Sequence, residues 1–155
     1  MEPKAGGLRF VERVRATNEV HADRLHPEAR RFVPAAVAAA VALHALGPKH
    51  VLVKGGHGSG LEVVDVLYDG KHFVEFSAAR IPTPNTHGTG CTLSSAIAAL
   101  LPQRSTVADA VRDAREYLLG AIRASGELDV GSGHGPLHHF HQLWRARRTA
   151  KGEPA

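Results

Sequence analysis

The residues best suited to chemistry form one run that leads into an apolar helix: Asn85-Thr86-His87-Gly88-Thr89-Gly90-Cys91-Thr92. Apolar residues at helical spacing follow it and predict a helix over 88–101, which Pro102 ends. A helix N-terminus presents unpaired N–H groups and the positive end of the helix dipole. Because Gly88 and Gly90 let a ligand approach the backbone, the run predicts an anion hole for phosphoryl oxygens. Two glycines alone would indicate only a helix cap, so this interpretation depends on the whole run.

Cys91 is predicted to lie in the first turn of that helix. A helix N-terminus favours the thiolate form of a cysteine, which suits a role in catalysis. The plainer alternative is a buried structural cysteine, but the position within the run favours function. Cys91 is the only cysteine in the chain, so no intrachain disulfide can form.

A second candidate site follows the apolar run Val51-Leu52-Val53. Such a run is typical of a short strand covered on both faces. It leads into the glycine-rich stretch 54–60, where Lys54 can reach a nucleotide phosphate and Gly55 and Gly56 are candidates for a nucleotide loop. The alternative for Lys54 is a surface lysine at a turn.

Helices and a hairpin are predicted to position these sites. The first helix covers 34–46, with Val37, Val41 and His44 on one stripe, and it stops at Gly47-Pro48. Pro34 is expected in its first turn, where the missing N–H does no harm.

Further along the chain, Asp69-Gly70 separates two β-rich segments, 62–68 and 72–76. Both turn residues tolerate positive φ, so this pattern predicts a β-hairpin. Thr106 and Asp109 then form a capping signature at the start of another amphipathic helix.

This order of elements predicts an α/β domain with helices on a mainly parallel sheet. Residues 1–32 are polar and charged and predict no strand. We therefore expect a poorly defined segment over 1–32, a domain over 33–141 and a basic tail over 142–155. Strand ends in a parallel α/β sheet gather at one edge, so Lys54 and Cys91 are expected to face the same cleft.

Charge and composition narrow the choice of ligands. The net charge is +4, but the basic residues are scattered and are not interleaved with aromatics, which argues against nucleic acid and suits a phosphorylated small molecule. No apolar run is long enough to span a membrane and no signal peptide is evident, so we expect a cytoplasmic protein. A zinc site built from histidines is a lesser alternative, because the histidines lack the fixed spacing of zinc ligands. The histidines concerned are His57, His87, His134, His138, His139 and His141.

Four strings, taken in order, resemble the hydroxymethylpyrimidine (phosphate) kinases of the ribokinase superfamily. They are Val51-Leu52-Val53-Lys54-Gly55-Gly56-His57, Asp65-Val66-Leu67-Tyr68-Asp69-Gly70, Asn85-Thr86-His87-Gly88-Thr89-Gly90-Cys91-Thr92-Leu93-Ser94 and Gly133-His134-Gly135-Pro136. The resemblance runs from about Thr17 to Phe140. It implies the C-terminal half of a ribokinase-like three-layer α/β fold, with a mainly parallel sheet flanked by helices and a β-hairpin.

The resemblance also implies an activity and residue roles. The activity is ATP- and Mg²⁺-dependent phosphorylation of hydroxymethylpyrimidine or its phosphate in thiamine biosynthesis. By the same resemblance, Gly88, Thr89 and Gly90 form the anion hole, and Cys91 acts there as a base or orienting residue. Lys54 contacts the ATP phosphates.

Two departures from the family bear on activity. The N-terminal half, which supplies the pyrimidine pocket in the family, has no counterpart here. His21 stands in place of the glutamate of a motif tied to Mg²⁺ and phosphate, and an imidazole cannot replace a carboxylate toward a hard cation. The metal site therefore stays open, with Asn18 as a candidate. We expect a kinase completed by a homo-oligomer or a complementing N-terminal half, or alternatively an inactive truncated domain that binds nucleotide, phosphate or a partner.

Overall fold

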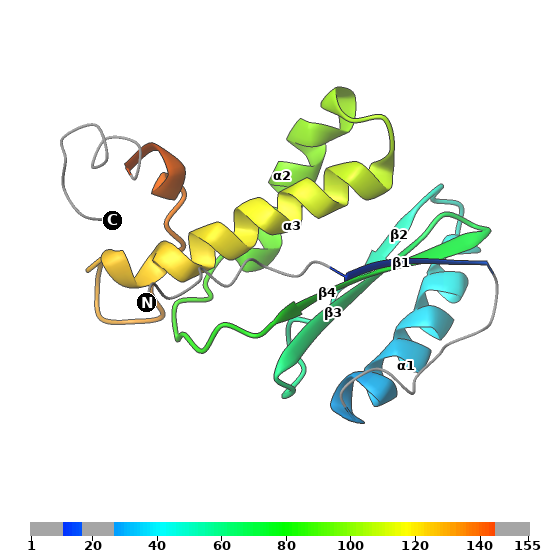
Figure 1. Ribbon diagram of the computed structural model, residues 1–155, viewed down its shortest axis with the longest axis horizontal. Helices are drawn as coiled ribbons and strands as arrows, with labels where there is room; N and C mark the ends of the chain where they lie inside the picture. Colours follow the sequence, from blue (N-terminus) through cyan, green and yellow to red (C-terminus); the bar gives the residue numbers. More distant parts are fainter. Residues whose placement is uncertain (1–10, 17–26, 145–155) are drawn as a thin grey trace, which may run out of the picture. The chain divides into compact units, whose positions relative to one another are not determined.

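The computed structural model describes residues 11–16 and 27–144, with side chains from residue 32 onward. The chain divides into two compact units, Met1–Arg80 and Ile81–Ala155 (Figure 1). In the described part of the chain, none of the helices has the length and apolar character needed to cross a membrane.

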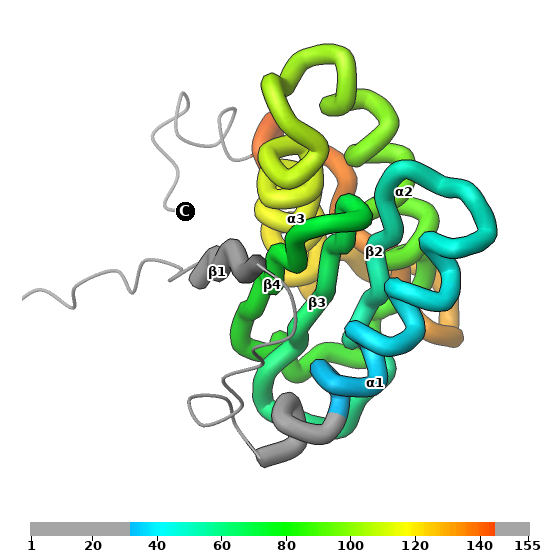
Figure 2. Tube along the Cα trace, turned by 90° about the vertical axis from the view of Figure 1, so that its right-hand side faces the viewer, coloured from blue at the N-terminus to red at the C-terminus, as the bar shows by residue number. Residues whose placement is uncertain are grey.

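The first unit is a four-stranded sheet with one helix against it (Figure 2). The elements are β1 (Val11–Ala16), α1 (Pro27–His44), β2 (Val51–Val53), β3 (Glu62–Tyr68) and β4 (His72–Ala79). The strand order is β1-β4-β3-β2, and every neighbouring pair is antiparallel. The helix α1 packs on β2 and β3.

The α/β class is as predicted, but the expectation of a mainly parallel sheet is wrong for the described strands. Parallel neighbours need a crossover connection of a dozen or more residues, whereas β3 and β4 are joined by a tight turn and β2 and β3 by the short loop 54–61. The strand β1 lies in the segment where no strand was predicted. Its pairing with β4, rather than any apolar pattern of its own, accounts for it.

The predicted hairpin is confirmed. Asp69 Oδ1 accepts hydrogen bonds from the backbone N–H groups of Lys71 (2.7 Å) and His72 (2.6 Å), and Gly70 has φ +94°. Partial burial acts to raise the pKa of Asp69, but these hydrogen bonds outweigh it and hold that pKa below its ordinary value. Beside the turn, Tyr68 stacks on Phe73 with ring centroids 4.2 Å apart. The turn and the ring pair set the register of the two longest described strands.

Alanine side chains of α1 pack against the sheet. Ala36 and Ala40 are buried in one cluster with Val51, Val66 and Phe73. The helix begins at Pro27 rather than Pro34, so it is Pro27 that occupies the tolerant first turn. Val41, predicted on the apolar stripe, is 47% exposed, because the face that meets the sheet is centred on the alanines.

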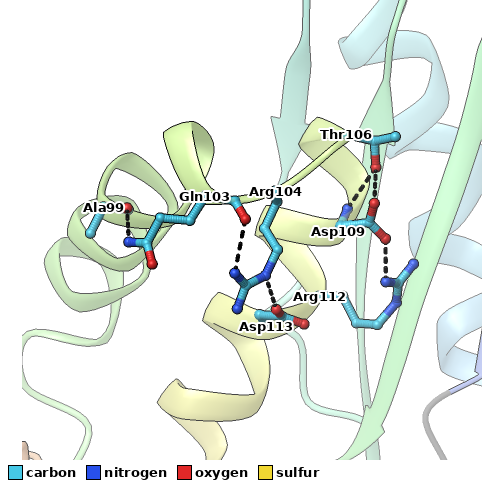
Figure 3. A network of polar contacts seen from close by, with 7 residues as sticks. All are labelled: Ala99, Gln103, Arg104, Thr106, Asp109, Arg112 and Asp113. Atoms are coloured by element: carbon cyan, nitrogen blue, oxygen red, sulfur yellow. Dashed lines mark hydrogen bonds and ion pairs between the residues drawn. The ribbon is translucent and has the colours of Figure 1, made fainter.

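The second unit is built around two helices, α2 (Thr89–Leu100) and α3 (Val107–Arg123). The 3-10 turn η2 (Leu101–Gln103) connects them, and η3 (Ala124–Glu127) follows α3. As predicted, the Thr106 hydroxyl caps α3 by accepting from the Asp109 N–H at 3.0 Å (Figure 3). The carboxylate of Asp109 accepts hydrogen bonds from the Thr106 hydroxyl and from Arg112. These bonds, with that from Thr106 the larger cause, hold the pKa of Asp109 below its ordinary value.

Candidate functional site

The predicted loop-to-helix junction at residues 88–92 is confirmed. Helix α2 begins at Thr89, and Gly88 is its N-cap with φ 82°, a left-handed conformation that favours glycine. The first intrahelical bond runs from the Thr92 N–H to the Gly88 oxygen at 2.9 Å. The N–H groups of Gly90 and Cys91 therefore belong to the first turn, where a helix supplies no acceptor of its own. The start of α2 is therefore a candidate anion site.

The string Gly133-His134-Gly135-Pro136 lies against the loop before α2. The Asn85 side-chain amide donates to the Ser125 backbone oxygen at 3.3 Å. An ideal Cβ on Gly135 would lie only 2.2 Å from Asn85 Oδ1, so glycine is needed for this close approach. His87 and Pro136 form a parallel β-bridge. The strings 85–92 and 133–136, far apart in sequence, therefore meet within the second unit.

Cys91 is exposed and borders an open groove of ≈ 610 Å³. One face of α2 contributes Cys91, Thr92, Ser95, Ala96, Ala99 and Leu100. Tyr117 and His139 complete the lining, and the Tyr117 hydroxyl donates to the His139 backbone oxygen at 3.0 Å. The alternative of a buried structural cysteine does not hold in this chain, because the thiol is open to a ligand.

The second candidate site is the glycine loop, residues 54–60, in the first unit. Lys54 follows directly on β2 and is exposed. The Gly55 N–H donates to Asp65 Oδ1 at 2.8 Å, and the Gly58 N–H donates to the Gly55 oxygen at 3.1 Å. An ideal Cβ on Gly55 would lie 2.1 Å from the backbone oxygen of Val64. The loop thus has a defined backbone course rather than an open coil.

The predicted site residues fall into both units. Lys54, Gly55 and Gly56 belong to the first unit, while the anion-hole residues and Cys91 belong to the second. A cleft shared by Lys54 and Cys91 stays a prediction. The metal candidate Asn18 and the divergent His21 lie outside the described residues. Over residues 32–144, whose side chains the structure describes, no three His, Cys, Asp or Glu side chains are grouped as a metal site would require.

Sequence reasoning missed the groups that support both loops. Asp65 and Arg80 bond to the backbone of the glycine loop, and Asn85 and Gly135 contact each other beside α2. Asp65 carried a usable signal, since it is a carboxylate within an apolar strand. The partners of Arg80 and Asn85 depend on long-range contacts for which the sequence holds no pattern.

Gly55→Ala is expected to destabilise the protein by about 1–3 kcal/mol, because the new methyl group meets backbone that cannot move aside cheaply. Urea unfolding followed by circular dichroism measures the change. Gly56→Ala is the matched control, since an ideal Cβ there meets nothing within 4 Å. Equal midpoints for the two variants would contradict the close approach of Gly55 to β3.

The chain is similar to several known proteins. Residues 14–138 match the sequence model of a family described as phosphomethylpyrimidine kinase. The chain is 49% identical over 106 residues to a hydroxymethylpyrimidine/phosphomethylpyrimidine kinase of Rhizobium meliloti, and the match covers 68% of this chain and 40% of that protein. The Escherichia coli protein of the same name is 47% identical over 102 residues, covering 66% of this chain and 38% of that protein.

Among solved structures, an ADP complex of Bacillus subtilis pyridoxal kinase is similar, with a TM-score of 0.66 and 35% sequence identity. That match covers 72% of this chain and 43% of the pyridoxal kinase. The chain therefore spans about two fifths of the length of the proteins it matches.

Proposed function

Because the chain belongs to the phosphomethylpyrimidine kinase family, we propose that it carries the phosphate-binding part of an ATP-dependent kinase. Its substrate is hydroxymethylpyrimidine or its monophosphate, and its role is in thiamine biosynthesis. The observation that carries the proposal is the start of α2, where Gly88 takes a left-handed conformation and Cys91 is exposed. A helix N-terminus of this kind binds phosphoryl oxygens.

In the proposed reaction, ATP supplies the phosphoryl group and ADP leaves. The attacking atom is the hydroxyl oxygen of hydroxymethylpyrimidine or a phosphate oxygen of its monophosphate. The N–H groups of the first turn of α2 bind the phosphoryl oxygens as negative charge shifts from the attacking to the leaving side. In this proposal Cys91 orients the accepting oxygen or takes its proton. Lys54 offsets the charge of the ATP phosphates.

The family also implies Mg²⁺, which accompanies ATP in phosphoryl transfer. Mg²⁺ is usually held by one or two carboxylates together with substrate phosphates. A site of this kind needs no cluster of three protein ligands, and none is found over residues 32–144. In our proposal these residues bind phosphate and leave the metal to the nucleotide and to other parts of the enzyme.

Full activity, in this proposal, needs the part of the family fold that the match does not cover. Either a complementing N-terminal half or a second copy of the chain would complete the site. The rival function is a non-enzymatic one, in which the chain binds nucleotide or phosphate without turnover. The start of α2 and the exposed Lys54 suit it equally, since neither depends on a completed substrate pocket.

Binding of ATP tests the element that both functions share. By calorimetry, the 155-residue chain is expected to bind ATP weakly, and Lys54→Gln is expected to weaken binding by about 10- to 100-fold through loss of a charged phosphate contact. Lys71→Gln is the matched control, because Lys71 is also exposed but lies in the β3–β4 turn. No ATP binding at millimolar concentration would refute the proposal, as would equal affinity in the Lys54 variant.

A further inference from the structure

Two residues outside the predicted site hold the glycine loop at both ends. We propose that Asp65 and Arg80 are positioning residues that order this loop before a nucleotide phosphate binds to it. The proposal rests on the proposed function, because it assumes that Lys54 and the loop contact ATP. It adds two residues, neither of which has to touch the nucleotide, and it assigns them a measurable effect on ATP affinity.

Asp65 holds the start of the loop. Its side chain is 4% exposed, and its Oδ1 accepts from the Gly55 N–H at 2.8 Å. The register of β2 and β3 explains the contact: Val53 pairs with Val66, so Asp65 lies opposite the chain immediately after β2 ends. The bond therefore fixes the backbone at the residue next to Lys54.

Arg80 holds the rest of the loop. Its Nε donates to the Gly60 oxygen at 2.5 Å, and its Nη1 donates to the Gly56 oxygen at 2.9 Å. The Arg80 backbone N–H also donates to the Leu61 oxygen at 2.7 Å. The remaining nitrogen, Nη2, is enclosed and has no hydrogen-bond partner among the described residues, so the two loop carbonyls account for the position of the guanidinium. A planar guanidinium can bridge two acceptors in this way, whereas a lysine ammonium is a point charge.

The loop needs such a clamp because of its composition. Glycines stand at four of its seven positions, 55, 56, 58 and 60, and glycine loses more conformational freedom on ordering than any other residue. A loop ordered in advance avoids that loss when the ligand binds. Carbonyl oxygens repel a phosphate, and Arg80 keeps two of them engaged. The clamp therefore favours phosphate binding in two ways.

The test compares Arg80→Lys and Arg80→Gln with Lys71→Gln in the full chain, using amide hydrogen exchange and ATP calorimetry. Lys71→Gln removes one positive charge from the same unit without touching the loop. Both Arg80 variants are expected to exchange at least about tenfold faster across residues 55–60, with exchange in β3 and β4 unchanged. Both are expected to bind ATP about 10- to 100-fold more weakly, while Lys71→Gln matches wild type.

Each other outcome decides against the proposal. If Arg80→Lys binds ATP as wild type does, charge and not the two-carbonyl clamp is what matters. If both Arg80 variants bind ATP normally while wild type binds it, the positioning role is wrong and the proposed function stands. If β3 and β4 lose protection in both variants, Arg80 is a structural residue. If wild type itself binds no ATP, the proposed function fails and the positioning role falls with it.

Discussion

Kinase turnover is expected to rise at least about 10³-fold when the chain is combined with the part of a curated relative that the match does not cover. Phosphoryl-transfer catalysis consists almost entirely of positioning and electrostatic stabilisation. In our proposal the start of α2 supplies the electrostatic part. Positioning of the acceptor can supply about 7–11 kcal/mol, and each 1.36 kcal/mol or so is about tenfold in rate. In our proposal the part that the match does not cover supplies the pyrimidine pocket, so adding it restores most of that contribution.

The measurement is ADP release with hydroxymethylpyrimidine phosphate as the acceptor. The Escherichia coli relative is a suitable donor for the complement, since the match leaves most of that protein uncovered. Pyridoxal serves as a second acceptor, because a similar solved structure is a pyridoxal kinase. Turnover by the chain alone that grows with the square of its concentration would favour a homo-oligomer over a complementing half. Turnover by a dilute monomer at the rate of an intact kinase would contradict the prediction.

Cys91→Ala is expected to lower kcat of the completed enzyme by about 10²- to 10⁴-fold, the range typical of a positioned acid–base group. Cys91 is exposed in the first turn of α2, beside the N–H groups that would bind the transferring phosphoryl group. Removing its thiol leaves those N–H groups in place, so ATP affinity is expected to change little. The effect should therefore fall on kcat rather than on the KM for ATP.

Ser95→Ala is the matched control for Cys91→Ala. Ser95 lines the same groove one helical turn further along α2 and is also exposed. None of the roles proposed above uses the Ser95 hydroxyl, so its loss is expected to leave turnover near that of the wild type. If the two variants lose activity equally, the groove as a whole matters and Cys91 has no special role. If the cysteine variant keeps wild-type turnover, Cys91 is not catalytic in this chain.

Local sequence was enough to predict several elements of this protein. The β3–β4 turn, the cap of α3 and the start of α2 all depend on the backbone preferences of a few adjacent residues: Asp69-Gly70, Thr106 with Asp109, and Gly88. The family resemblance also rested on short strings, two of which contain Asp69-Gly70 and Gly88, and the comparisons confirm it. Caps and turns depend on residues only a few positions apart, so they can be predicted without knowing the fold.

Long-range contacts decided the rest. The antiparallel order of the sheet and the presence of β1 follow from pairing between segments far apart in sequence. The exposure of Val41 depends on which face of α1 meets β2 and β3. Arg80 reaches the glycine loop, and Asn85 reaches Gly135, only because the folded chain brings them together. A hydrogen-bond partner tens of residues away leaves no periodic or local trace in the sequence, so tertiary structure alone reveals which residues hold the candidate site in shape.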